Sequence, residues 1–143
     1  QYANWSIKYK MKVTNSLLLD KFLSSSGIST DTRKIEKGNL FFALKGPNFN
    51  ANILAKEALE KGASYAVIDD PEFDLGEKTF LVPDGLKALQ DLALQYRKTL
   101  TIPIIGLTGS NGKTTTKELI RDVLRCKYDV SATKGNLNNH SCR

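Results

Sequence analysis

The predicted fold follows from residues 106–120, GLTGSNGKTTTKELI, in which a glycine-rich turn joins an apolar run to an amphipathic stretch. The run before the turn, Ile102–Leu107, is continuous and rich in β-branched residues, which is typical of a central parallel strand. The stretch after it, Lys113–Cys126, has apolar residues at helical spacing. We therefore predict a buried strand that leads through residues 108–112 into a helix beginning near Lys113.

A turn in this context is suited to binding a polyphosphate. Two glycines permit backbone conformations that direct successive amide groups inward at the positive end of the following helix. Lys113 would reach the β and γ phosphates of ATP as the catalytic residue, and Thr114 would ligate Mg²⁺ as the metal-binding residue. The predicted cofactor-binding residues are Thr108, Gly109, Ser110, Asn111, Gly112, Lys113, Thr114 and Thr115.

The spacing of this turn departs from the standard pattern G-x-x-x-x-G-K-[ST], because Leu107 occupies the position of the first glycine. The alternative is a glycine-rich turn capped by Ser110 or Asn111, with Lys113 in solvent. The preceding apolar run, the lysine and three consecutive threonines favour nucleotide binding.

The distribution of charge agrees with a phosphate ligand. The net charge is +6, and residues 113–143 contribute seven Lys or Arg against three Asp or Glu. An excess that begins at the turn is better explained by a polyphosphate than by a nucleic-acid duplex. Zinc-finger spacing and RNA-binding aromatic motifs are absent from the sequence, so we expect no nucleic-acid partner.

Composition also bounds the compartment. No run of eighteen apolar residues occurs, and residues 1–10 lack the apolar core of a signal peptide, so we expect a cytoplasmic protein without a membrane partner. Cys126 and Cys142 follow no metal-binding or redox spacing, and both are expected to be reduced. We expect a monomer.

The remaining pattern predicts an α/β organisation. Strands are expected at 39–44, 65–69, 79–82 and 128–133, and helices at about 54–59, followed by Gly62, and from the cap Asp84 to about 98. Three divisions follow: an extension over 1–10, a first domain over 11–83, and the start of a second, ATP-binding domain over 84–143.

Three segments resemble the Mur ligases. The turn TGSNGKTTT is similar to that of these enzymes and of the related folylpolyglutamate synthetases. Residues 29–52, STDTRKIEKGNLFFALKGPNFNAN, resemble the uridine-nucleotide-binding domain of the Mur ligases. Residues 133–140, TKGNLNNH, resemble the members that add D-alanyl-D-alanine. The resemblance covers residues 11–140.

The resemblance implies both a fold and a reaction. The fold is a small Mur-ligase N-terminal uridine-nucleotide-binding domain, followed by the first β-α-β unit of a truncated P-loop ATPase domain. In the reaction, ATP phosphorylates the terminal carboxylate of UDP-N-acetylmuramoyl-tripeptide, and the amine of D-alanyl-D-alanine attacks the acyl phosphate. Such an enzyme serves peptidoglycan synthesis, and through it cell shape and cell division.

The resemblance also implies which residues bind the substrate. They are Ser29, Thr30, Asp31, Thr32, Arg33, Lys45, Asn48, Asn50, Asn136, Asn138 and Asn139. The last three of these, with Thr133 beside them, would face either the muramoyl peptide or a metal ion. Ala51 replaces a glycine common in the family, and the lone His140 is given no role. After GNLNNH the family pattern would continue with a Gly-Val-Pro stretch and, further on, the acidic second metal ligand, the modified lysine, the adenine pocket and the dipeptide site, whereas this chain ends in SCR. The chain alone is therefore not expected to catalyse.

Three other functions stay open. A Mur ligase that adds the third amino acid would share the early domain, and GNLNNH is the short segment that favours the D-alanyl-D-alanine ligase. A folylpolyglutamate synthetase would lack the uridine-binding segment before the turn. A non-catalytic uridine-nucleotide-binding module would keep that segment without turnover.

Overall fold

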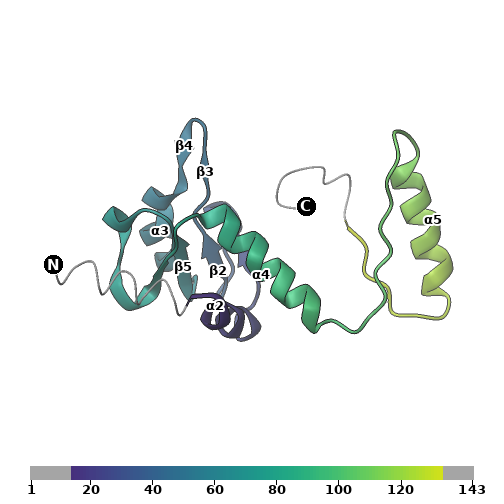
Figure 1. The fold of residues 1–143 in the computed structure, drawn as a ribbon, viewed down its shortest axis with the longest axis horizontal. Helices are drawn as coiled ribbons and strands as arrows, with labels where there is room; N and C mark the ends of the chain where they lie inside the picture. The colour runs from purple at the N-terminus through teal and green to yellow at the C-terminus, as the bar shows by residue number, and fades with distance from the viewer. Residues whose placement is uncertain (1–13, 134–143) are drawn as a thin grey trace. The chain divides into compact units, whose positions relative to one another are not determined.

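The structure is a computed structural model that describes residues 14–133. It forms two compact units, which divide between Leu100 and Thr101. Figure 1 shows the ribbon of both units, and each unit is described here by itself.

A four-stranded parallel sheet organises the first unit. Its strands are β1 (Ile28–Ser29), β2 (Leu40–Phe42), β5 (Tyr65–Ile68) and β6 (Thr79–Leu81), in the order β1-β2-β5-β6. Every neighbouring pair is parallel, so all four strands end at the same edge of the sheet. In α/β sheets this carboxyl edge is where ligands bind.

Helices cover both faces of this sheet, and the register of the strands assigns side chains to each face. Phe41 lies opposite Ala66 and packs with α3 (Ala55–Glu60) in one cluster of buried residues. Phe42 lies opposite Val67 and packs in a second cluster with α2 (Thr14–Leu23) and α4 (Gly85–Thr99). Because successive side chains of a strand point to opposite faces, one apolar strand supplies both cores.

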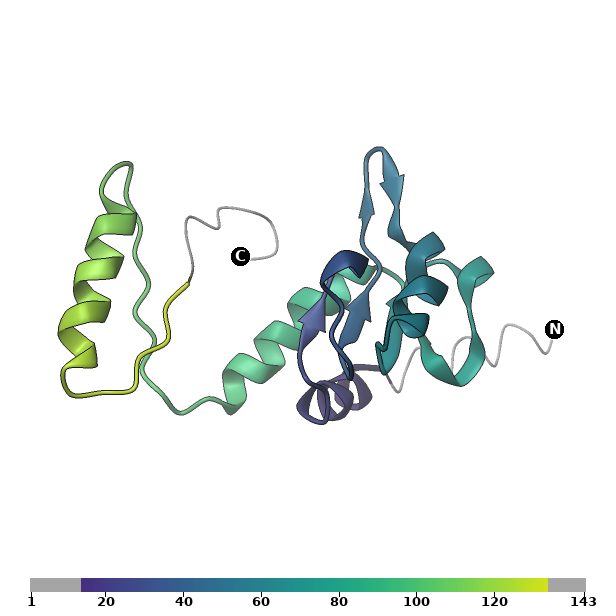
Figure 2. The same ribbon diagram turned by 180° about the vertical axis from the view of Figure 1, so that it is seen from behind.

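Short elements connect these strands. A hairpin of β3 (Lys45–Gly46) and β4 (Phe49–Asn50) follows β2 and continues into the 3-10 helix η2 (Ala51–Leu54). Figure 2 shows this hairpin projecting beyond the sheet. The 3-10 helix η1 (Thr32–Lys34) follows β1, and η3 (Pro71–Phe73) and η4 (Gly76–Lys78) lie between β5 and β6.

Several predicted elements of the first unit are confirmed. The predicted strands at 39–44, 65–69 and 79–82 contain β2, β5 and β6, and the helix expected at 54–59 is α3. Asp84 caps α4 as expected, because its carboxylate accepts a hydrogen bond from the Lys87 backbone at 2.8 Å. Gly62 follows α3 with a positive φ of 109°, the conformation that favours glycine after a helix.

The second unit contains one regular element among its described residues, the helix α5 (Lys113–Arg125). The predicted start of this helix at Lys113 is confirmed. The strands predicted at 102–107 and 128–133 are wrong: neither segment is paired, and Ile105 is 59% exposed. A parallel strand is stable when neighbouring strands supply its hydrogen bonds, and the described residues 101–133 contain no such partner strand.

The spatial division also differs from the boundary expected near Pro83. α4 packs on the first unit, where Leu92 is buried with Leu18 and Phe42, so this unit extends to Leu100. Amphipathic spacing alone indicates that a helix has a buried face and not which core receives it. The assignment of 84–143 to an ATP-binding domain stays a prediction.

Among the helices of residues 14–133, none combines the length and the apolar character that crossing a membrane requires.

Candidate functional sites at the turn before α5 and at the carboxyl edge of the sheet

The turn before α5 contains two glycines whose backbone has a positive φ. Gly109 has φ 147° and Gly112 has φ 78°, both in the region that side chains disfavour. Gly112 is the residue that precedes the helix, and no side chain caps the first turn of α5. The amide groups at this helix start therefore keep their positive potential for an anionic ligand.

Lys113 lies over the same turn. Its ammonium donates a short hydrogen bond to the Gly109 carbonyl and lies 3.5 Å from the Ser110 carbonyl. The cation and the helix start thus converge on one small loop, where they can offset the charge of a polyphosphate.

The residues after Lys113 fit a metal-bound nucleotide. Thr114 and Thr115 are exposed in the first turn of α5, where the Thr114 hydroxyl is an oxygen donor of the kind Mg²⁺ prefers. The described residues hold no cluster of three His, Cys, Asp or Glu side chains that could bind a metal by themselves. Mg²⁺ at this place would be held by the Thr114 hydroxyl together with phosphate oxygens.

A second group of predicted site residues lies at the carboxyl edge of the sheet. Ser29 ends β1, and its hydroxyl donates to the Asp31 carbonyl at 2.9 Å and accepts from the Asp31 backbone at 3.3 Å. Thr32 is buried at the start of η1, whereas Thr30 is exposed. The turn is therefore held by its own side chains, with Thr30 and Arg33 facing solvent.

Asp31 and Arg33 form a bidentate ion pair in this turn. The Arg33 Nε donates to Asp31 Oδ1 at 2.9 Å, and Nη2 donates to Oδ2 at 2.7 Å. The hydrogen bond from Arg33 is the main reason that the pKa of Asp31 lies far below its usual range, and the same contact raises the pKa of Arg33. Since the Arg33 side chain is 84% exposed, its guanidinium is accessible to a phosphate group.

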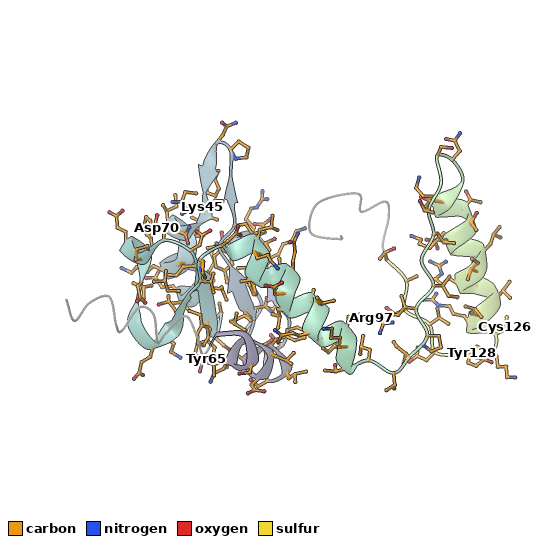
Figure 3. The ribbon with its side chains drawn as sticks, in the orientation of Figure 1. Lys45, Tyr65, Asp70, Arg97, Cys126 and Tyr128 are labelled. Carbon is orange, nitrogen blue, oxygen red and sulfur yellow. The ribbon has the colours of Figure 1, made fainter. Side chains whose placement is uncertain are left out.

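The β3–β4 hairpin carries the next three predicted residues. Lys45 and Asn48 are exposed on it, and Asn50 is half-buried. Figure 3 shows Lys45 and Asp70 near one another above the sheet, and Tyr65 at the opposite end of its strand. Because the hairpin follows β2 and the Ser29 turn follows β1, two neighbouring parallel strands bring these segments to one edge.

Asn52 and Asp69 complete this edge, and the sequence reasoning missed both. Asn52 is fully buried, and its amide nitrogen donates to Asp69 Oδ1 at 2.7 Å. The Lys45 ammonium lies 3.1 Å from the same oxygen. Burial raises the pKa of Asp69, but the hydrogen bonds from Asn52, from the Gly85 backbone and from Lys45 together hold it below its ordinary value. A carboxylate directly after the strand YAVI was the available signal.

The alanine that departs from the family pattern fits its place. Ala51 is buried at the start of η2, and no residue other than glycine has a positive φ among residues 14–133. The backbone at this position is therefore open to any residue with a small side chain.

The remaining residues named from the sequence lie near the end of the chain. Asn136, Asn138, Asn139, His140 and Cys142 lie outside the described residues. Thr133 is exposed, and its carbonyl accepts a hydrogen bond from the Lys117 ammonium at 2.5 Å.

Comparison with known proteins adds to this geometry. The family model of the Mur ligase middle domain matches residues 107–142. The UDP-N-acetylmuramoyl-tripeptide–D-alanyl-D-alanine ligase of Synechocystis is 46% identical over 131 residues, covering 90% of this chain and 28% of the relative. The ligase of the same name from Bacillus subtilis is 45% identical over 116 residues, covering 80% and 25%.

A solved structure agrees with these relatives. The MurF ligase of Thermotoga maritima in complex with ADP superposes with a TM-score of 0.71 at 31% identity, over 81% of this chain and 27% of that one. The chain thus spans about a quarter of the length of the curated relatives it matches.

The parallel sheet between helices defines a mixed α/β protein, in which a glycine-rich turn precedes the helix α5. Along most of its length the chain is similar in sequence to Mur ligases, and it shares the fold of a solved member. The α/β fold class expected from the sequence is confirmed.

Proposed function

We propose that this chain supplies two substrate-binding segments of an ATP-dependent ligase of peptidoglycan synthesis. The ligase joins D-alanyl-D-alanine to UDP-N-acetylmuramoyl-tripeptide, the reaction named by relatives that are 46% and 45% identical. The observation that carries the proposal is the turn at residues 108–112, with its two positive-φ glycines before the uncapped start of α5. A relative in complex with ADP supports the choice of ATP.

In the proposed reaction, a carboxylate oxygen is a poor leaving group until it accepts the γ-phosphoryl group of ATP. The amine of the dipeptide then displaces phosphate from the acyl phosphate. Lys113 and the amides of residues 108–115 would hold the nucleotide phosphates and offset negative charge as the phosphoryl group moves. Mg²⁺, held by Thr114 and the phosphates, would supply further charge neutralisation.

The carboxyl edge of the sheet would hold the uridine nucleotide. The proposal assigns Arg33 and Lys45 to the diphosphate, because both cations are accessible at this edge. Polar side chains of Ser29–Thr32, Asn48 and Asn50 would contact the uridine, and Asn136, Asn138 and Asn139 the muramoyl peptide. The proposed domains are residues 11–83 for the uridine nucleotide and 84–143 for ATP, with α4 at the start of the second domain packing on the core of the first unit. We propose a monomer that works in the cytoplasm.

Nucleotide titration tests this proposal on the chain itself. The ligase reaction is named for relatives of which the chain spans about a quarter. Binding of the nucleotide is therefore the property to measure on this chain. Calorimetry should give a micromolar to millimolar affinity for Mg²⁺-ATP, about 4 to 8 kcal/mol of binding free energy. Lys113→Ala should weaken it roughly tenfold or more, because a charged hydrogen bond to phosphate is lost. Lys127→Ala, which removes an exposed lysine after the same helix, is the control.

The uridine assignment has a separate test. Titration with UDP-N-acetylmuramoyl-tripeptide should give saturable binding in the absence of ATP, and an adenosine diphosphate sugar should bind at least roughly tenfold more weakly. Arg33→Ala should reduce the affinity for the uridine nucleotide. Equal affinity for the two nucleotides, or no effect of Arg33→Ala, would contradict the assignment.

A further inference from the structure

We propose that Asn52 and Asp69 are positioning residues of the uridine-nucleotide site, which hold the Lys45 ammonium and the Asn50 amide at the carboxyl edge of the sheet. This inference rests on the function proposed above. Neither side chain is assigned a contact with the nucleotide, because both act through the β3–β4 hairpin.

Asn52 has the contacts of a fixed buried amide. Its nitrogen donates to Asn50 Oδ1 at 2.6 Å and to Asp69 Oδ1 at 2.7 Å, and its oxygen accepts from the Asp69 backbone at 3.0 Å. The side chain is 0% exposed. Because both N–H groups and the carbonyl are engaged out of contact with water, the amide has one favoured orientation. It therefore ties the end of the hairpin at Asn50 to the end of β5.

Asp69 connects three elements. Its Oδ1 accepts from Asn52 and lies 3.1 Å from the Lys45 ammonium, while its Oδ2 accepts from the Gly85 backbone at 3.2 Å. Gly85 is the first residue of α4, where a carboxylate is favourable near the positive helix end. The Asp69 side chain is 11% exposed, so its carboxylate cannot rotate without losing these partners in a poorly solvated place.

The contact with Asp69 restricts the Lys45 side chain. Its side chain is 43% exposed, and its only other carboxylate within ion-pair range in the described structure, Asp70, lies 3.8 Å away. A lysine side chain is flexible and loses rotamer freedom when it binds a ligand. A rigid anchor at Asp69 removes part of that freedom beforehand, so that less is lost when a diphosphate arrives.

A comparison of two probes separates positioning from general support of the fold. Uridine 5′-diphosphate and uridine are titrated into the chain and its Asp69→Asn, Lys45→Ala and doubly substituted variants by calorimetry. Asp69→Asn keeps the shape and one acceptor but removes the charge that anchors Lys45. We expect Asp69→Asn to weaken the diphosphate roughly fivefold and Lys45→Ala roughly tenfold, with the affinity for uridine within about twofold of the parent.

The doubly substituted variant and a neighbouring carboxylate complete the design. If Asp69 acts through Lys45, the double variant should bind the diphosphate no more weakly than Lys45→Ala alone. Asp70→Asn is the matched control, because Asp70 is more exposed and farther from the ammonium. It should change the affinity by less than about twofold.

The inference is overturned if Asp69→Asn leaves the diphosphate affinity unchanged or increases it, if it weakens uridine equally, or if the two substitutions multiply. These outcomes differ from failure of the proposed function, in which the parent would not bind the diphosphate or Lys45→Ala would have no effect, and the inference would fall with it.

If a variant does not fold, a measurement on the parent chain alone still tests the inference. Carbon relaxation in nuclear magnetic resonance should show the Lys45 side chain to be more ordered than that of Lys56, which makes an exposed ion pair with Glu60 at 3.9 Å. Equal mobility of the two side chains would contradict an anchored Lys45.

Discussion

Apolar side chains form a buried core in the first unit and are largely exposed in the second. In the first unit, Phe41 and Val67 are 0% exposed, because parallel strands pair beneath covering helices. In the second unit, Leu119 is 62% exposed and Val123 is 71% exposed on α5. Apolar residues become a core only where paired strands and helices meet, whereas the glycine-rich turn forms from residues that are adjacent in sequence. The geometry of the turn before α5 thus depends on residues close in sequence, whereas the sheet edge that would hold the uridine nucleotide is built from distant segments.

Truncation of one apolar side chain in each unit, buried in the first and exposed in the second, should give the largest contrast. Phe41→Ala removes a ring from the centre of the first core and should lower the free energy of unfolding by about 3 to 5 kcal/mol. Leu119→Ala removes an exposed side chain and should change it by less than about 0.5 kcal/mol. Urea denaturation followed by circular dichroism measures both. Similar losses in the two variants would contradict the burial of Phe41 and the exposure of Leu119.

Hydrogen exchange should separate the paired strand β5 from the unpaired segment 102–107. Amides in β5 are hydrogen-bonded to β2 and should exchange at least roughly a hundredfold more slowly than amides of residues 102–107. Mass spectrometry of peptides from the two segments gives the rates. Protection of 102–107 equal to that of β5 would show that this segment is paired as a strand, as its sequence first suggested.

The helices α4 and α5 differ in how their first turns are capped, and the expected effect on stability is smaller. Asp84 caps α4 through the Lys87 backbone, whereas α5 begins after a glycine with no side-chain cap. Asp84→Ala should lower the unfolding free energy of the first unit by about 1 kcal/mol, because a helix amide loses its acceptor. Asp91→Ala removes an ion pair with the exposed Lys87 side chain and should cost less than about 0.5 kcal/mol. Thermal denaturation of the two variants compares them, and equal shifts would argue against the cap.

Several features could be predicted because they are encoded over short distances. Apolar runs indicated the strands of the first unit, Asp84 indicated a helix start, and the spacing of glycines and lysine indicated the loop before Lys113. Residues 102–107 have the same apolar character as a buried strand, but their pairing depends on neighbours elsewhere in the fold. Composition cannot distinguish an unpaired run from a paired one.

The candidate site also contains some contacts between residues close in sequence and others between distant residues. Asp31 and Arg33 meet because they are two residues apart, and the sequence motif already contained both. Asn52 and Asp69 are seventeen residues apart, and they meet only because η2 lies beside the end of β5. Their contact depends on how the hairpin returns to the sheet, which local pattern does not determine. The domain assignments and the individual binding roles stay predictions.

A crossed titration tests the central claim, that each unit carries its own nucleotide-binding segment, most directly. Mg²⁺-ATP and uridine 5′-diphosphate are each titrated by calorimetry into the parent, Lys113→Ala and Lys45→Ala. We expect Lys113→Ala to weaken ATP roughly tenfold and to leave the uridine nucleotide within about twofold, and Lys45→Ala to do the reverse. If either substitution weakens both ligands equally, or if ATP binds Lys113→Ala as tightly as the parent, the account of two separate segments is contradicted.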